Sequence, residues 1–393
     1  MNRKEFIKMC GLLGLSIPFQ TVLSSCSKDD NEPVNNNDSI IIIGAGVAGM
    51  TAAYLLAQKG INFQIIEASS TYGGRIKRTT SFVDFPIPLG AEWLHTSATE
   101  LSTIVNNSSI QINTQLQGYQ SQDQVGYFEN GSLTLSPIFT EFGSDFEDKK
   151  FINSSWLDFF EEYIVPSISS KMIFNKQITS INYSGSKVIL TDNAGQNYES
   201  DKVIVTVPLK ILQEGVISFT PTLPTSHTSS IQNAPIWGGI KVFIEFSSKF
   251  YPSYLTFPDS ETNTGQRVYY DASHGQNSSA NVLGLVALGT QAEQYQNLSG
   301  NALKIYILDE LDAVFGGLAT TNYIKHIVQD WSNEPFIKAA YLADIADSEI
   351  SENLSISVAN KLFFAGDAYT KEDDWGGVHN ASRSARDVIN EIT

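Results

Sequence analysis

The sequence predicts an α/β fold built on a parallel sheet, and three observations support this prediction. Ile40 to Ile43 is an uninterrupted apolar run, which is typical of a strand buried on both faces of a parallel sheet. A glycine-rich turn follows, and Val47 to Gln58 then has the length and composition of a helix that stops before Gly60. Asn62 to Glu67 completes a strand–helix–strand unit, which is the repeating element of nucleotide-binding sheets.

Similar elements recur along the whole chain, so the domains are expected to be discontinuous. Strands are predicted at Lys176 to Tyr183 and Lys187 to Leu190 (a hairpin), Lys202 to Val207, Ile240 to Phe246, Val282 to Gly289 and Leu362 to Ala365, and helices at Ala302 to Phe315 and Val378 to Ile392. We assign residues 39–96, 171–235 and 350–393 to the nucleotide-binding domain. Residues 97–170, expected to be mostly helical, and 236–349 are assigned to a second, substrate-binding domain of mixed sheet and helices, of the α+β type.

The first 26 residues have the features of a targeting segment rather than of folded structure. A positively charged start, with Arg3 and Lys4, precedes an apolar stretch from Met9 to Leu23. The following Ser24-Ser25-Cys26 completes a pattern that resembles the lipobox of bacterial lipoproteins. We therefore expect a signal peptide over 1–26, a polar tether over 27–38, and an exported protein that is lipid-anchored at Cys26 and faces the periplasm or lies at the cell surface. A buried N-terminal helix is the alternative, which Pro18 disfavours.

Cysteine content and charge exclude several kinds of site. The chain has 2 cysteines, Cys10 and Cys26, both within the expected targeting segment, so we expect no internal disulfide, no cysteine-rich metal site and no catalytic thiol. The net charge of −17 comes from scattered acidic residues, which argues against nucleic acid as a partner. This charge suits attraction of a cationic substrate, and solubility alone is the other explanation.

The turn after the first strand carries the clearest binding motif. Gly44-Ala45-Gly46-Val47-Ala48-Gly49 fits the GxGxxG pattern, whose glycines permit a tight turn, close approach of a pyrophosphate, and close packing of helix on strand. Glu67 ends the second strand 67 − 44 = 23 residues after the first glycine, where an acid binds the hydroxyls of a ribose. These features predict a dinucleotide cofactor and leave both NAD and FAD open.

The next residues favour FAD through a resemblance to a known family. Glu67-Ala68-Ser69-Ser70-Thr71-Tyr72-Gly73-Gly74-Arg75 resembles the acidic-then-GGR motif of the flavin amine oxidase family, of monoamine and polyamine oxidase type. Further blocks that are similar to the family follow in order: Leu89 to His95, Val205 to Leu209, Phe219 to Pro224, Gly238 to Phe243, Trp331 with Tyr341, Phe363 to Asp367 and Gly377 to Ala381. Residues 97–170 resemble nothing that we can name.

The resemblance implies a set of FAD-binding residues. Backbone of Gly73 and Gly74 would approach the cofactor, and Arg75 would place its charge beside the pyrophosphate. The implied set is Gly44, Ala45, Gly46, Val47, Ala48, Gly49, Glu67, Ala68, Gly73, Gly74, Arg75, Leu89, Gly90, Ala91, Glu92, Ile178, Gly366, Asp367, Gly377 and Val378. Thr71, Pro88 and Thr96 depart from the family pattern, and Asp367 replaces its usual glutamate. Because no cysteine lies near Tyr341, we expect the FAD to be bound non-covalently.

The resemblance also implies roles at the substrate side. Lys241 matches the family's active-site lysine, which holds a water against flavin N5; a lysine at a strand edge with its head in solvent is the alternative. Tyr341 matches one wall of an aromatic cage, and Trp375 is either the opposite wall or a packing residue of the turn. His95 follows a tryptophan as in polyamine-oxidising members, where a pocket histidine lies, and a structural histidine is the alternative. His379 is expected to pack at the start of the last helix.

Together these residues predict an FAD-dependent oxidoreductase that oxidises an amine, and a polyamine is one candidate substrate. In the family, hydride passes from the carbon next to nitrogen to flavin N5, O2 reoxidises the flavin, and the products are an imine or aldehyde and H2O2. A desaturase or porphyrinogen-type oxidase of the same fold, acting on an apolar molecule, is one alternative. A flavin-binding surface protein without catalysis is the other, since Thr71, Thr96, Gly377 and Asn380 depart from the family pattern.

Overall fold

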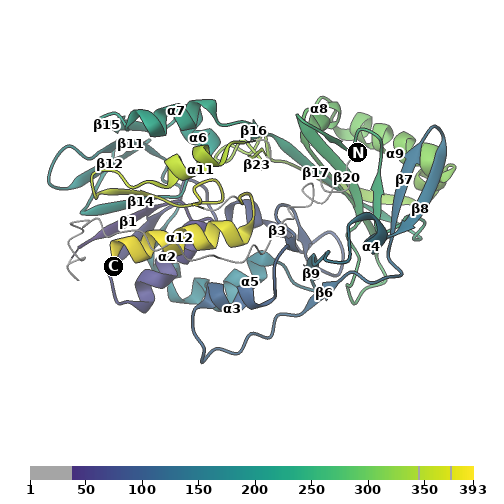
Figure 1. Cartoon of the computed structure of the whole chain (residues 1–393), viewed down its shortest axis with the longest axis horizontal. Helices are drawn as coiled ribbons and strands as arrows, with labels where there is room; N and C mark the ends of the chain where they lie inside the picture. The colour runs from purple at the N-terminus through teal and green to yellow at the C-terminus, as the bar shows by residue number, and fades with distance from the viewer. Residues whose placement is uncertain (1–37, 344–345, 372–373) are drawn as a thin grey trace, which may run out of the picture.

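The computed structural model describes residues 38–343, 346–371 and 374–393, which form two halves side by side (Figure 1). The expected signal peptide, the lipobox with Cys26 and nearly all of the polar tether lie outside the described residues. Each half is organised around its own sheet, and the chain passes between the halves repeatedly. Within the described residues, no helix has both the length and the apolar character required to cross a membrane.

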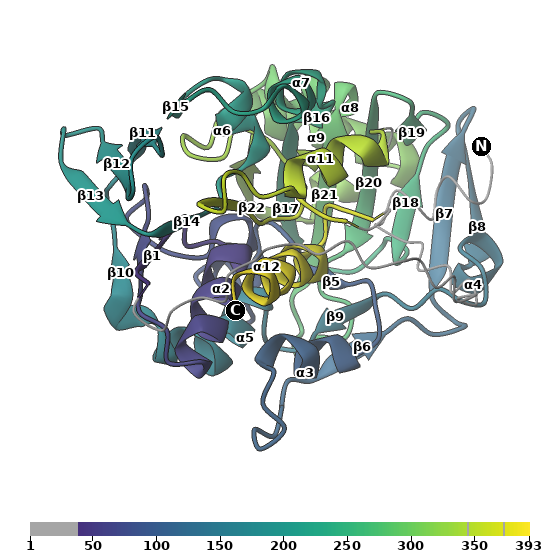
Figure 2. The same cartoon turned by 60° about the vertical axis from the view of Figure 1, so that its left-hand side comes forward.

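The first half is a parallel sheet of five strands in the order β10-β2-β1-β14-β24. The strands are β1 (Ile40–Ile43), β2 (Phe63–Ile66), β10 (Met172–Ile173), β14 (Lys202–Val205) and β24 (Leu362–Phe364). Because side chains alternate along a strand, β1 supplies both cores. Ile40 and Ile42 pack against helices α2 (Val47–Gln58) and α12 (Val378–Ile392), which lie together on one face (Figure 2). Ile41 and Ile43 pack into the core on the other face.

A small second sheet and short helices cover that other face. The sheet has the order β13-β12-β11-β15, and the predicted hairpin is its antiparallel centre. Its strands are β11 (Ile178–Asn182), β12 (Val188–Asp192), β13 (Asn197–Ser200) and β15 (Ser218–Thr220). The helices are α6 (Leu209–Gln213), α7 (Thr225–Asn233) and α11 (Ser348–Ser355). The strands of the parallel sheet all run in the same direction, so their carboxyl ends meet at one edge of the sheet. This edge faces the second half (Figure 1).

The second half is a mixed sheet in the order β22-β17-β21-β20-β18-β7-β8, with β19 (Glu261–Thr262) paired to β20. Its strands are β7 (Gln124–Glu129), β8 (Ser132–Pro137), β17 (Gly239–Phe246), β18 (Tyr254–Thr256), β20 (Gly265–Asp271), β21 (Asn281–Gly289) and β22 (Tyr323–Asp330). Helices α8 (Thr290–Gln296), α9 (Gly300–Phe315) and α10 (Leu318–Asn322) cover the face that receives Ile240, Val242 and Ile244. Alternation along β17 puts Lys241 and Phe243 on the opposite face, where Phe243 packs in a further core and Lys241 lines the cavity described below.

Three small sheets connect the halves. Strand β3 (Arg78–Thr79) pairs with β4 (Ile87–Pro88), and β16 (Ile236–Trp237) pairs with β23 (Tyr341–Leu342). Strand β9 (Lys149–Phe151) lies between β5 (Trp93–Leu94) and β6 (Leu116–Gly118). The remaining helices are α3 (Thr99–Val105), α4 (Ile138–Glu141), α5 (Trp156–Tyr163) and the short 3-10 turns Gly74–Ile76, Val165–Ser167 and Ser169–Lys171.

The predicted α/β fold is confirmed, but the expectation for residues 97–170 was wrong in two respects. The range is not mostly helical, because β7 and β8 form a hairpin at one edge of the second sheet. Parts of it also lie with the first half: Leu101 and Ile104 of α3 and Phe159 of α5 pack in the core beneath β1. Their apolar spacing alone did not say which of two sheets they cover, because that depends on long-range packing.

Candidate active site

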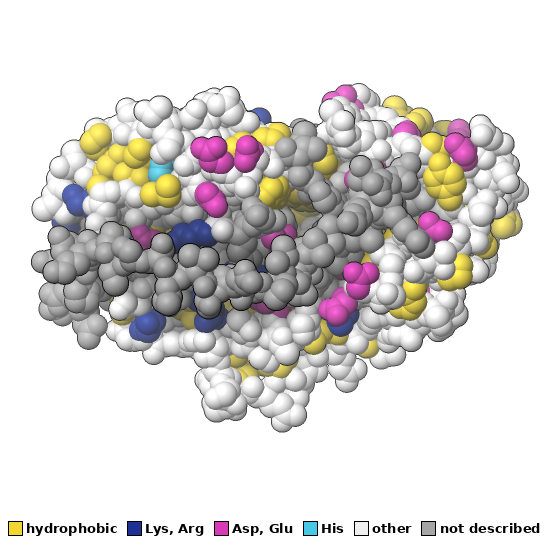
Figure 3. All heavy atoms as spheres, viewed as in Figure 1, with side chains coloured by type: hydrophobic (Ala, Val, Ile, Leu, Met, Phe, Trp, Pro, Cys, Tyr) yellow, Lys and Arg dark blue, Asp and Glu magenta, His cyan; other side chains and the backbone are white. Residues whose placement is uncertain are grey.

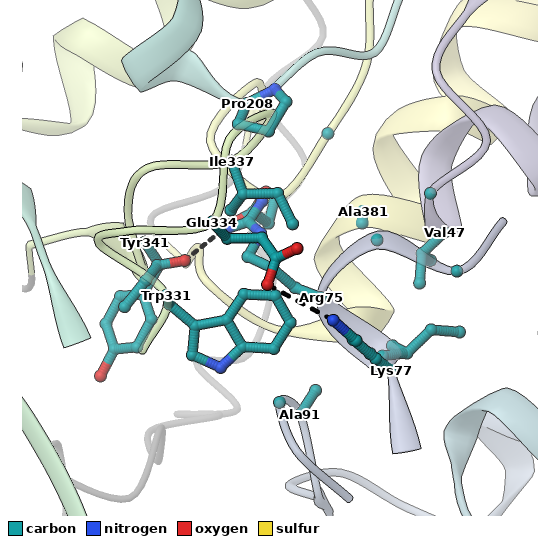
Figure 4. Close-up of a pocket in the computed structure, with 18 of the residues that line it drawn as sticks. Val47, Arg75, Lys77, Ala91, Pro208, Trp331, Glu334, Ile337, Tyr341 and Ala381 are labelled. Carbon is teal, nitrogen blue, oxygen red and sulfur yellow. Dashed lines mark hydrogen bonds and ion pairs between the residues drawn. The ribbon is translucent and has the colours of Figure 1, made fainter. Parts of the chain in front are cut away.

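A cavity lies between the two halves, at the carboxyl ends of β1, β2 and β14. On the side of the first half it is lined by the glycine turn, the start of α2 and the segment Glu67 to Lys77. On the other side it is lined by β17, β20 and β21, with Trp331 and Tyr341 (Figure 4). A crevice beyond the carboxyl ends of parallel strands is where open α/β sheets bind their ligands.

The glycines of the predicted motif are required by close contacts. Gly44 has φ +106°, and a Cβ there would lie 2.7 Å from Thr206 Oγ1. A Cβ on Gly49 would lie 2.0 Å from the carbonyl oxygen of Gly44, so only glycine lets α2 pack this closely on β1. By contrast, a Cβ on Gly46 would have no protein atom within 4 Å and would project into the cavity lining. These are the three roles that the pattern predicts for its glycines.

The start of α2 is free to receive an anion. Gly46 caps the helix without a side-chain hydrogen bond, and the first turn carries no acidic residue. The N-terminal N–H groups and the positive end of the helix dipole therefore face the cavity without a counter-charge from the helix itself. The Gly73 N–H donates to the Ala45 carbonyl (2.8 Å), which holds the second glycine segment beside the first. This cradle fits the pyrophosphate of a dinucleotide.

Glu67 is oriented by backbone donors. Its Oε2 accepts from Ala45 N at 2.7 Å and its Oε1 from Ser69 N at 2.8 Å. Each carboxylate oxygen keeps a further lone pair, and Glu67 lines the cavity. The residue is thus held rigidly at the position where the motif predicts a ribose-binding acid.

Arg75 and Asp367, predicted separately as cofactor contacts, are brought together by the fold. Arg75 Nη1 donates to Asp367 Oδ2 at 2.9 Å, and its Nη2 pairs with the other carboxylate oxygen. Arg75 Nη1 also donates to the carbonyl of Ala340. A planar guanidinium against a carboxylate is the geometry of a bidentate pair. Both residues line the cavity, so the charge of Arg75 is already paired within the site.

The segment Leu89 to Ala91 is clamped between the two halves. Ala91 N donates to the carbonyl of Arg75 at 2.9 Å, and Trp331 Nε1 donates to the carbonyl of Leu89, also at 2.9 Å. A Cβ on Gly90 would lie 1.8 Å from the Arg75 carbonyl oxygen, so no other residue fits between them. Gly90 and Ala91 line the cavity, and their place beside the cofactor stays a prediction.

Lys241 belongs to a buried charge network. Its Nζ donates to Glu92 Oε2 (2.8 Å), to the Gly90 carbonyl (3.0 Å) and to the Pro88 carbonyl (3.2 Å). Lys150 Nζ lies 2.9 Å from the other Glu92 oxygen, and Tyr270 OH donates to Glu92 Oε2 at 2.5 Å. The alternative of a lysine head in solvent is wrong, because Lys241 is 4% exposed.

Burial and neighbouring charges shift the pKa values in this network. Burial opposes ionisation of Glu92, but Lys150 and Lys241 hold its pKa below the ordinary value. Burial lowers the pKa of Lys241; Glu92 opposes this shift and Lys150 reinforces it. Glu92 was predicted as a cofactor-side residue, and it does line the cavity, but its Oε2 accepts from Lys241 and Tyr270 and its Oε1 forms an ion pair with Lys150.

The aromatic residues lie as follows. Tyr341 lines the cavity, and a Cβ on Gly376 would lie 3.4 Å from its ring, so this glycine gives the tyrosine its space. Trp375 also lines the cavity, but its Nε1 donates to the Ala343 carbonyl at 3.3 Å and it packs against the core of the first half. The predicted packing role is therefore observed, and its role as a wall opposite Tyr341 stays a prediction. Trp93 adds a face, with its ring centroid 5.5 Å from Lys241 Nζ.

Two histidines at the cavity each pair with an acid. His95 Nδ1 lies 2.9 Å from Asp148 Oδ1, and His379 Nε2 lies 3.0 Å from Asp374 Oδ2. Burial lowers the pKa of His95, but the carboxylate of Asp148 outweighs this effect and the pKa is raised above its ordinary value. His379 is at the first turn of α12, where it was predicted to pack.

Sequence reasoning missed Lys150, Tyr270 and Asp148. Lys150 and Asp148 lie in the range that resembles no known block, and a lysine within a short polar stretch has the pattern of a solvated residue. The pairing of β9 with β5, which sets Lys150 opposite Trp93, brings it to the site. No local signal in the sequence indicates that pairing.

Comparisons with known proteins agree with this geometry. Residues 160–393 match the family described as flavin containing amine oxidoreductase, and residues 42–107 match the NAD(P)-binding Rossmann-like domain. The chain is 22% identical to polyamine oxidase 5 of Oryza sativa subsp. japonica, over 88% of this chain and 86% of that protein. It is 24% identical to human lysine-specific histone demethylase 2, over 85% of this chain and 51% of that protein.

Two solved structures share the fold. A wild-type putrescine oxidase bound to putrescine superposes with a TM-score of 0.73 at 16% identity, over 90% of this chain and 98% of that one. Cyclohexylamine oxidase from Brevibacterium oxydans gives a TM-score of 0.72 at 16% identity, over 90% and 99%. Because the family match spans more than half of the sequence, and the glycine cradle fits a dinucleotide, the chain belongs to the flavin-containing amine oxidoreductase family and its cofactor is FAD.

Proposed function

We propose that this enzyme oxidises a diamine or polyamine that carries no carboxylate, with O2 as the electron acceptor. The observation that carries the proposal is the lysine at the cavity wall: Lys241, held by Glu92 and facing the space between the glycine cradle and Tyr341. The names of the relatives, polyamine oxidases and a putrescine oxidase, support the substrate class. Bound FAD supplies the hydride acceptor at N5 and the site of reoxidation.

The protein's own groups would prepare the amine. Aromatic faces of Tyr341 and Trp93 exclude water and attract an ammonium as it enters, and a neutral amine is favoured once the site closes around it. The Nζ of Lys241 lies 5.5 Å from the ring centroid of Trp93 and 5.0 Å from that of Phe243, so its charge is shielded from bulk water. The pair of His95 with Asp148 offers a polar contact for a second nitrogen of the substrate.

The charges around the cavity argue against an amino-acid substrate. Each lysine and arginine among the described residues that line it is within ion-pair distance of a carboxylate: Arg75 of Asp367, Lys77 of Glu334, Lys176 of Asp192, Lys241 of Glu92, and Arg267 of Asp259 and Glu310. A substrate carboxylate would therefore compete with a protein carboxylate for every one of these cations. The net charge of −17, with acids distributed over both halves of the face in Figure 3, favours cationic substrates instead.

A substrate panel tests the proposal. The purified holoprotein is mixed with diamines, polyamines, monoamines and α-amino acids, and both H2O2 and bleaching of the flavin absorbance are followed. We expect H2O2 with diamines or polyamines and none with amino acids. Bleaching without H2O2 in air would replace O2 by another acceptor. A flavin that is reduced by light but by no amine would contradict amine oxidation and favour an apolar substrate.

We also propose that the FAD is bound non-covalently and that the protein is an exported lipoprotein anchored at Cys26. The position of both cysteines before the first described strand supports the first point, and the lipobox-like sequence supports the second. Acid precipitation should leave the flavin in the supernatant. Cys26→Ala should move the protein from the membrane to the soluble fraction, and a wild-type protein found entirely in the soluble fraction would contradict the anchor.

A further inference from the structure

The buried carboxylate of Glu92 is shared by two lysines of different strands. Lys241 comes from β17 and approaches Oε2 at 2.8 Å, while Lys150 comes from β9 and approaches Oε1 at 2.9 Å. All three side chains are at least 95% removed from solvent, with 5% exposure for Lys241, 2% for Lys150 and 1% for Glu92. Two cations and one anion in such a place leave an excess positive charge that water does not screen.

The two lysines are not equivalent. Lys150 donates to the carbonyls of Asp271 (3.0 Å) and Ala272 (2.7 Å), and is fixed behind Glu92, away from the cavity lining. Lys241 lines the cavity. Of the groups packed around Lys241, the charged ones are Glu92 and Lys150; Tyr270 donates its hydroxyl to Glu92, and Trp93 and Phe243 present ring faces. Nearby, His95 pairs with Asp148 and Lys249 pairs with Asp271.

We propose that Lys150 and Glu92 are opposed positioning residues for Lys241: Glu92 tightens and Lys150 loosens the hold of Lys241 on its proton at the cavity wall. As a three-proton ammonium, Lys241 has one acceptor for each N–H, namely Glu92 Oε2 and the carbonyls of Gly90 and Pro88. Loss of one proton would leave a lone pair facing one of these three oxygens and would remove the hydrogen bond to it, so the charge state of Lys241 sets how firmly its ammonium or amine group is held at the cavity wall. The inference rests on the proposed function only for its consequence in catalysis.

The test is a pH titration of the oxidised holoenzyme, without substrate, followed by the visible absorbance of bound flavin. An ionisation beside the flavin shifts this spectrum whether or not any amine is turned over, so the result is independent of the proposed function. Lys241→Met should remove the titration that belongs to Lys241. Lys150→Gln keeps hydrogen-bond donors but removes the like charge, and should raise the midpoint pH of the titration. The acid ionisation constant of Lys241 should fall by about tenfold or more.

Glu92→Gln removes the opposite charge and should lower the midpoint by a similar factor. A purely structural disturbance would move the two variants in the same direction, so opposite shifts identify the charge effect. Lys150→Arg keeps the charge and should leave the midpoint near that of the wild type. Lys202→Gln is the matched control: Lys202 is another buried lysine, on β14, and lies 3.8 Å from Asp38, at the end of the sheet remote from the cavity.

FAD content and the thermal unfolding midpoint show which variants are folded, and Lys150→Met, which also removes the like charge, carries the comparison if Lys150→Gln does not fold. Shifts of Lys150→Gln and Glu92→Gln in the same direction, or a titration that survives in Lys241→Met, would overturn the proposal. If no amine of the panel is oxidised but the two variants still shift the midpoint in opposite directions, the proposed substrate class is contradicted and this inference is not.

Discussion

The two halves of the molecule present different chemistry to the same cavity. The first half offers backbone: Gly44 and Gly49, which pack too closely to carry a Cβ, N–H groups at the start of α2, and a carboxylate on Glu67 that is itself oriented by backbone donors. The second half offers buried side-chain charge and aromatic rings, with Lys241 paired to Glu92 of the connecting segment, and Tyr341. Backbone geometry suits a cofactor of fixed shape, while ionisable side chains suit a substrate whose charge must change during reaction.

The difference predicts that the two halves fail differently when mutated. A substitution at a glycine of the cradle should act sterically, because the added side chain changes FAD affinity, the stability of the fold, or both. A change in the charge network should leave the cofactor bound and alter proton equilibria or rates.

Gly49→Ala should cause the largest loss. Its Cβ would lie 2.0 Å from the backbone oxygen of Gly44 and 3.0 Å from Thr206 Oγ1, so α2 would have to move away from β1. We expect a destabilisation of about 1–3 kcal/mol or more and a protein that is isolated without FAD. The measurements are flavin absorbance per protein and the thermal unfolding midpoint.

Gly46→Ala is the matched control for that substitution. No protein atom lies within 4 Å of the added methyl group, so the apoprotein should lose no more than about 1 kcal/mol. The methyl would instead occupy the space where backbone approaches the pyrophosphate, and FAD affinity should fall at least about tenfold. Normal FAD affinity in Gly46→Ala would show that the pyrophosphate lies elsewhere.

Lys241→Met should separate chemistry from cofactor binding. Glu92 retains Lys150 and Tyr270 as partners, so the carboxylate stays paired and the protein should fold and bind FAD. Without the lysine we expect flavin reduction by amine or reoxidation by O2 to slow by about a hundredfold, within the range for loss of a proton-handling group. Stopped-flow absorbance measures both half-reactions. Wild-type rates in both half-reactions would show that Lys241 has no role in the mechanism, and would contradict the proposed difference between the two halves.

His95→Gln should change the pH dependence of stability. The pKa of His95 is raised in the folded protein, so its pairing with Asp148 contributes stability that is fully present below the unfolded pKa and is lost as pH rises through the folded value. The unfolding midpoint of the wild type should therefore exceed that of His95→Gln at acidic pH, and the two should converge as the pH becomes alkaline. A difference that grows toward alkaline pH would contradict the assignment of this pair.

The same contrast explains which features were predictable from the sequence. Local sequence patterns predict the glycine turn, α2, Glu67 and the ends of the first strand and helix, since each depends on residues within one strand–helix unit. The bounds of α2 and of α12 match the predicted ones. In the second half, Lys241 was recognised only through resemblance, and its partner Lys150 comes from a strand 91 positions earlier (241 − 150 = 91) that no local pattern marks. Pairing between distant strands is set by tertiary packing, which a single sequence does not display.

Asp201→Asn should have the smallest effect and serves as a reference outside both kinds of site. Asp201 precedes β14; it accepts from Ser39 N at 2.9 Å and from Ser39 Oγ at 2.8 Å, and pairs with Lys187. Although burial opposes ionisation, these donors lower the pKa of Asp201 to about 2. A depressed pKa contributes stability above the unfolded value, which is lost as pH falls through the folded value, and solvent screening reduces it to about 1 kcal/mol near neutral pH.

The measurement for Asp201→Asn is the unfolding midpoint of wild type and variant from neutral to strongly acidic pH. We expect a constant small deficit near neutrality that vanishes at acidic pH, with FAD content and the flavin titration unchanged. Because Asp201 lies at the start of β14, and the cavity lies at the end of that strand, the perturbation has no short path to the site. A change in flavin content would mean that a side-chain ion pair far from the cavity affects FAD binding. That result would contradict the claim that backbone geometry controls the cofactor site of the first half.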